Sequence, residues 1–117
     1  MSGLSLPDAL SRLAELIPER VLWVNHTEEV AAVMACGHHR LVWAGADEWL
    51  IEGALREEIE ARAWDWNVYV LGTEPGQHKH YTAIICPDMH EAWEEIGDAD
   101  TPAHALALAL IAALEAE

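Results

Sequence analysis

The chain has 117 residues, 52% of them apolar, and this length supports one folded domain but leaves little room for two. Its 21 Asp and Glu residues outnumber its 6 Lys and Arg residues, so the formal net charge is −15 and the isoelectric point is near 4.6. This charge repels phosphate, which excludes a basic nucleic-acid-binding surface, disfavours an anionic membrane and favours a basic protein as the partner.

We expect a soluble chain in a reducing cytoplasm. Its two cysteines, Cys36 and Cys86, are too few for a disulfide framework. The first ten residues lack the basic and apolar segments of a signal peptide. The longest uncharged apolar stretch, 101–114, is too short and too rich in alanine to span a bilayer.

The first predicted element is a helix that begins after Ser5. Ser5 is a suitable N-cap, and Pro7 and Asp8 suit the first turn of a helix. Leucines then recur at helical spacing until Pro18, which marks the end of the helix. The apolar run 21–24 fits either a short strand or a packed continuation of this helix.

The middle of the chain is predicted to form two helices and a strand. A short helix is expected over 27–36, because Thr27 can cap its start and Gly37 can end it. A short strand is expected over 41–43. Residues 46–63 are predicted to form an amphipathic helix, since their large apolar side chains share one broad helical stripe and most glutamates lie elsewhere.

After residue 63 the apolar period changes to that of a strand. Apolar and polar residues alternate over 64–71, and residues 78–86 suit a second strand. A Thr-Glu-Pro-Gly turn separates the two strands, so the segment is predicted to be an antiparallel hairpin with Trp64 and Trp66 facing the core. One or two helical turns are expected over 89–96.

The last predicted element is a helix over 101–115. Thr101 is its expected N-cap and Pro102 its first helical residue. No polar residue interrupts it between Ala105 and Leu114. A helix this uniformly apolar is usually buried on more than one side, so it is either the central element of the fold or a contact surface for another subunit.

Metal-binding and catalytic motifs do not stand out. Cys36, His38 and His39 lie close together, and His78 and His80 would share one face of a strand. Neither group has the ligand spacing of a recognised metal site. There is no nucleophile elbow, phosphate-binding glycine loop or papain-like cysteine context. We predict no catalytic residue, no metal site and no cofactor, and a small metal-dependent enzyme remains as an alternative.

Acidic residues gather in two stretches. One is 88–100, which has no Lys or Arg, and the other is 47–60, where Arg56 is the only base. Like charges at helical spacing are mildly destabilising, so unmixed stretches are candidate contacts for the Lys and Arg residues of a partner, although general solubility explains them equally well. The candidate partner-binding residues are Glu91, Trp93, Glu94, Glu95, Asp98 and Asp100, followed by Glu52, Glu57 and Glu58.

A motif precedes and opens the last helix. Residues 98–106 read Asp-Ala-Asp-Thr-Pro-Ala-His-Ala-Leu and continue into a helix rich in alanine and leucine. This motif resembles the C-terminal signature of the phage ABA-sandwich family of small bacteriophage and prophage proteins, and the similarity covers about residues 46–117. The resemblance implies a phage origin and helices packed on a small antiparallel sheet, α/β/α sandwich-like, with no catalytic residues. The extreme acidity and the Cys-Gly-His-His sequence at 36–39 depart from the family.

The sequence therefore predicts one α+β domain over 1–117, with helices 46–63 and 101–115 packed on the hairpin of strands 64–71 and 78–86. The leading functional hypothesis is a non-enzymatic phage protein that binds a basic, nucleic-acid-binding host protein in the host cytoplasm. It would act as a nucleic-acid mimic that inhibits a bacterial defence or DNA-handling system. The alternative is a phage structural or accessory module that self-associates through its terminal helix.

Overall fold

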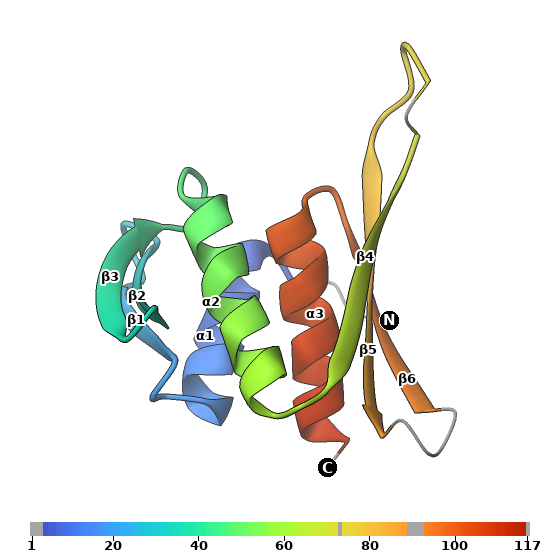
Figure 1. Cartoon of the computed structure of the whole chain (residues 1–117). Coiled ribbons are helices and arrows are strands. Elements are labelled where there is room, and N and C mark those ends of the chain that lie inside the picture. The colour runs from blue at the N-terminus through green and yellow to red at the C-terminus, as the bar shows by residue number, and fades with distance from the viewer. Residues whose placement is uncertain (1–3, 73, 89–92, 117) are drawn as a thin grey trace.

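The computed structural model describes residues 4–72, 74–88 and 93–116, and the side chains of residues 88, 93 and 94 are outside the described part. The helices are α1 (Leu6–Leu16), α2 (Glu48–Ala61) and α3 (Pro102–Glu115), and the strands are β1 (Val21–Asn25), β2 (Val30–Ala35), β3 (His38–Trp43), β4 (Asp65–Leu71), β5 (His80–Asp88) and β6 (Trp93–Ala99) (Figure 1). None of the described helices is long and apolar enough to cross a membrane.

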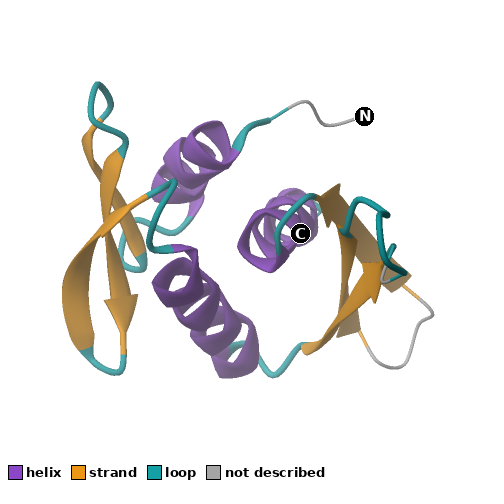
Figure 2. Cartoon of the chain, turned by 90° about the horizontal axis from the view of Figure 1, so that it is seen from above, coloured by secondary structure: helices purple, strands orange, loops and turns teal. Residues whose placement is uncertain are grey.

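The helices lie between two antiparallel sheets. Strands β1, β2 and β3 form sheet A, and strands β4, β5 and β6 form sheet B, each with its strands in chain order. Seen from above, sheet A, the pair α1 and α2, then α3, then sheet B follow one another across the molecule (Figure 2). The predicted α+β class is confirmed. The layer order differs from the α/β/α expectation, because two sheets enclose the helices.

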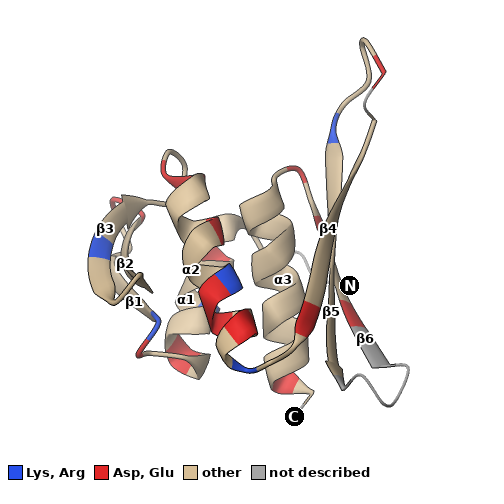
Figure 3. Cartoon of the chain, in the orientation of Figure 1, with Lys and Arg blue, Asp and Glu red and all other residues tan. Residues whose placement is uncertain are grey.

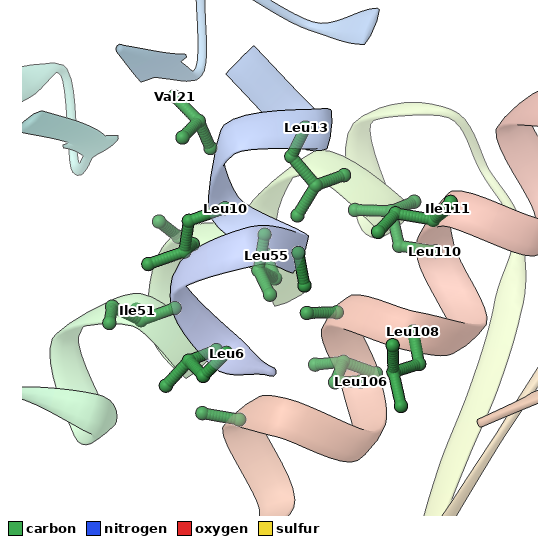
Figure 4. Close-up of a cluster of buried hydrophobic side chains, with 14 of the residues drawn as sticks. Leu6, Leu10, Leu13, Val21, Ile51, Leu55, Leu106, Leu108, Leu110 and Ile111 are labelled. Atoms are coloured by element: carbon green, nitrogen blue, oxygen red, sulfur yellow. The ribbon is translucent and has the colours of Figure 1, made fainter. Parts of the chain in front are cut away.

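Helix α3 is the central element of the core. Thr101 caps it by accepting a hydrogen bond from the backbone N–H of His104, and Pro102 stands at its start, as predicted. Nine of its residues are buried, because α1 and α2 pack on one side of it and β5 and β6 on the other. Its leucines meet those of α1 and α2 in one apolar cluster (Figure 4). Burial on both sides leaves α3 little exposed surface for self-association.

Strand β6 lies directly against α3 at Gly97. A β-carbon at this position would lie 2.5 Å from the backbone nitrogen of Ala109 and 2.9 Å from the Cβ of Leu108, and it would overlap the carbonyl oxygen of Ala105. The strand and helix backbones therefore pack directly on each other, and no side chain fits between them.

The predicted helix over 27–36 is wrong. Residues 26–29 form a turn, and Val30–Ala35 is the central strand of sheet A, paired with β1 and β3. The run Val-Ala-Ala-Val-Met-Ala is apolar throughout, so its periodicity does not distinguish a buried strand from a helix. Alanine has a high helix propensity, which favoured the prediction of a helix. Cys36 and Gly37 both have positive φ, 52° and 81°, which is the geometry of a tight two-residue hairpin turn.

The elements of sheet B largely follow the prediction. The strands predicted over 64–71 and 78–86 are β4 and β5, and Val68 pairs with Ala83 in their antiparallel register. Trp64 and Trp66 are half-buried against the core. The helical turns predicted over 89–96 are wrong for residues 93–96, which begin β6 and pair with β5, and the remaining residues 89–92 lie outside the described part.

Candidate binding surfaces

The carboxylates of α2 are bound within the chain. Glu58 is buried and accepts hydrogen bonds from Nε of Arg20 at 3.1 Å and from Nε of Arg62 at 2.7 Å. Both oxygens of Glu57 lie 2.9 Å from the backbone nitrogen of Cys36, and Oε1 is 3.4 Å from Nη1 of Arg20. These two glutamates join α2 to sheet A. Glu58 is therefore too buried to be an exposed contact for a partner, whereas Glu57 keeps part of its side chain exposed and its contact with a partner stays a prediction.

The third predicted α2 contact, Glu52, is half-buried and lies 3.9 Å from Nε of Arg56. Glu48 accepts a hydrogen bond from Oγ1 of Thr101 at 2.7 Å. The carboxylates of α2 thus bind partners in the helix itself and, through Glu48, Glu57 and Glu58, partners far away in the sequence.

The hydrogen bond from the Cys36 N–H holds the pKa of the Glu57 carboxyl below its ordinary value, and the charge of Arg20 acts in the same direction. Because the pKa of Glu57 is lower in the folded than in the unfolded state, its carboxylate stabilises the fold at pH values above the ordinary Glu pKa of 4.5. This stabilisation is lost as the pH falls through the pKa of the folded state. We expect wild type to be more stable than Glu57→Gln near about pH 7, with the difference shrinking below about pH 4.5. Urea unfolding of both proteins across this range measures the difference, and a constant difference would contradict the assignment.

Two of the predicted contacts, Asp98 and Asp100, face histidines. Asp98 accepts a hydrogen bond from Oγ1 of Thr82 at 2.6 Å and lies 3.4 Å from Nε2 of His80. Asp100 lies 3.0 Å from Nε2 of His78, and this hydrogen bond lowers the pKa of Asp100. Both aspartates are exposed, but a protonated imidazole beside each one would offset its negative charge.

The remaining predicted contacts do not assemble into one acidic surface among the described residues. Glu95 stands opposite the buried Ile85, so it lies on the inner face of β6, whereas the adjacent Ile96 is 53% exposed on the outer face. Glu91 lies outside the described residues, and so do the side chains of Trp93 and Glu94.

The outer face of sheet A carries an apolar surface that the sequence prediction missed. The register places Leu22, Ala32 and Leu41 in one row across the sheet and Val30 beside Trp43 in the next. Three of these side chains are more than half exposed, Leu22 at 54%, Leu41 at 69% and Trp43 at 52%. The apolar face of sheet A consists of Leu22, Val24, Val30, Ala32, Met34, Leu41 and Trp43, of which Val30 and Ala32 are buried beneath their neighbours, and His39 lies beside Met34 at its edge.

The three strands of sheet A contain no Asp or Glu, although the whole chain has a net charge of −15. The nearest acidic residues along the chain stand at the ends of the sheet, Glu19 before β1 and Glu28 and Glu29 in the turn between β1 and β2. The apolar face is therefore free of carboxylates and bordered by them (Figure 3). The sequence carries a sign of this carboxylate-free face, since no acidic residue occurs between residues 30 and 46.

A cavity of about 520 Å³ lies between α2 and the hairpin of β2 and β3. Ala35, Leu50 and Gly53 contribute apolar atoms to its wall, and Trp49, which is 71% exposed, lines it from α2. Cys36 from the β2–β3 turn, Arg40 from β3 and three charged residues of α2, Arg56, Glu57 and Glu60, complete the lining.

No group of three or more His, Cys, Asp or Glu side chains in residues 4–72, 74–88 and 93–116 is placed to hold a metal ion. Comparisons of the chain with protein-family models, curated proteins and solved structures find no match.

Proposed function

We propose that this chain is a non-enzymatic binding protein that docks the apolar face of sheet A on a basic protein partner. The observation that carries this proposal is a carboxylate-free apolar face on a chain with a net charge of −15. Contiguous exposed apolar surface is unfavourable in water, and on soluble proteins it marks sites of protein–protein contact. Trp43 and Leu41, both more than half exposed, are the side chains that gain most from being covered.

The basic character of the partner follows from the border of this face. Glu19, Glu28 and Glu29 are exposed at the ends of sheet A, where they would meet the rim of a partner's interface. Opposite charge at the rim steers association and speeds it, while the buried apolar centre sets the lifetime of the complex. A partner with an apolar patch ringed by Lys and Arg complements both parts.

Phosphate mimicry has less support than docking through sheet A. Such mimicry needs an array of free carboxylates, and those of Glu57 and Glu58 are bound by donors of the chain itself. The resemblance to phage ABA-sandwich proteins supports a bacterial host protein as the partner, met in the host cytoplasm, and makes bacterial lysate the appropriate source.

The test replaces Leu41 with aspartate. Leu41 is 69% exposed, so the variant is expected to fold with an unchanged melting temperature. Wild-type protein should retain a basic protein from bacterial lysate, and Leu41→Asp should weaken the affinity for that protein by about 30-fold, the size of an interface hot spot. Surface plasmon resonance with the purified partner measures the affinity, and added salt should slow association of wild type.

Ile96→Asp is the matched control, because Ile96 is 53% exposed on the outer face of sheet B, on the opposite side of the molecule. This variant should bind like wild type. A partner that binds Leu41→Asp as tightly as wild type would refute docking through sheet A. If retention instead depended on Asp98 and Asp100, phosphate mimicry would replace the proposal.

A further inference from the structure

We propose that the cavity between α2 and the β2–β3 hairpin is a binding site for a small aromatic carboxylate. This inference is independent of docking through sheet A, because the cavity opens beside α2 and the apolar face points away from the helices. Its volume of about 520 Å³ falls within the range of roughly 300–1,000 Å³ that is usual for small-molecule sites.

The apolar part of the cavity combines the exposed indole of Trp49 with open space above Gly53. Trp49 is 71% exposed, so an aromatic ring stacked on its indole would remove a large apolar surface from water. Gly53, one helical turn further along α2, has no atom within 4 Å of the place where a β-carbon would lie. Glycine inside a helix is unfavourable, and here its missing side chain leaves the space open for a ligand.

The charged part of the cavity has two guanidinium groups, and that of Arg40 is the freer one. Arg40 forms no ion pair or side-chain hydrogen bond within the described part of the chain. Arg56 lies 3.9 Å from Glu52, and its guanidinium is 5.9 Å from the ring centre of Trp66. Figure 3 shows Lys and Arg positions on β3 and α2, the two elements that provide these arginines. An unpaired arginine favours a carboxylate, which it can bind through two parallel hydrogen bonds.

The two carboxylates in the lining are already used by donors of the protein. Glu57 accepts from the backbone of Cys36 and from Arg20, and Glu60 lies 3.3 Å from the indole Nε1 of Trp66. Their charge still disfavours a dianion such as phosphate. The lining therefore suits a ligand with a flat apolar body for Trp49 and a single negative charge for Arg40.

The test compares naphthoate with naphthamide, an uncharged probe of almost the same shape, by calorimetric titration of the intact chain. Salt at about 0.15 M screens the distant acidic residues. Wild type should bind naphthoate roughly tenfold more tightly than naphthamide, as expected for one charge-assisted pair. Arg40→Gln should remove this preference while it leaves binding of the amide unchanged.

Two further variants locate the bound probe. Gly53→Leu places a side chain in the cavity, and its β-carbon contacts no other atoms, so the protein should fold and lose binding of both probes. Leu41→Asp, which alters the apolar face of sheet A, should bind both probes like wild type. Equal binding of acid and amide by wild type, or binding that survives in Gly53→Leu but is lost in Leu41→Asp, would overturn the proposal.

Discussion

Leu110→Ala is expected to lower the free energy of unfolding by about 2–5 kcal/mol, because the side chain of Leu110 is fully buried in the middle of α3. Helices α1 and α2 pack on one side of α3 and sheet B on the other, so the surroundings cannot easily close the cavity that alanine leaves. Urea or thermal unfolding measures the loss, which should lower the melting temperature by more than about 5 °C.

Leu71→Ala is the matched control for this prediction. Leu71 ends β4 and is 57% exposed, so its truncation should change the stability by less than about 0.5 kcal/mol. A Leu110→Ala variant that melted within a degree or two of wild type would show that α3 is not the centre of the core.

Gly97→Ala is expected to destabilise the protein by about 3 kcal/mol, although it adds a single methyl group. The new carbon would overlap the carbonyl oxygen of Ala105 and come within 2.5 Å of the backbone nitrogen of Ala109. Backbone atoms cannot rotate away as the end of a flexible side chain can, so β6 must move off α3. Thermal unfolding measures this effect.

The same substitution at Gly53 should have the opposite sign. Gly53 lies inside α2, and a β-carbon at this position would have no atom within 4 Å, so alanine restores helix propensity and should stabilise the protein by about 0.5–1 kcal/mol. Equal effects of the two substitutions would mean that β6 and α3 are not in direct backbone contact.

The sequence predicted α3, α2 and the hairpin of sheet B because each has a strong local signal. Thr101 and Pro102 mark the start of α3, and alternation of apolar and polar residues marks β4. Sheet A was harder to predict, because β2 is apolar throughout and its strand conformation depends on pairing with β1 and β3. Local propensity cannot report such pairing, and tertiary contacts override it.

The site was less predictable than the fold. The composition indicates the acidic stretch of α2 but not the groups that bind its carboxylates, because Arg20, which binds Glu58, lies 38 residues earlier in the chain. The apolar face of sheet A depends on the register of three strands, which brings Leu22, Ala32 and Leu41 side by side. The absence of acidic residues between 30 and 46 is a compositional sign of this face, but the contacts between distant segments that form both features are not encoded in composition or period.

The central position of α3 also governs the order in which the chain can fold during synthesis. Sheet A, α1, α2 and sheet B precede α3 in the sequence, and α1, α2, β5 and β6 pack directly on α3. A ribosome-bound chain that ends before residue 102 therefore exposes the apolar sides of α1, α2 and sheet B that α3 would cover. Until α3 emerges, these exposed apolar surfaces are prone to aggregation, so the appearance of α3 is the step that completes the core.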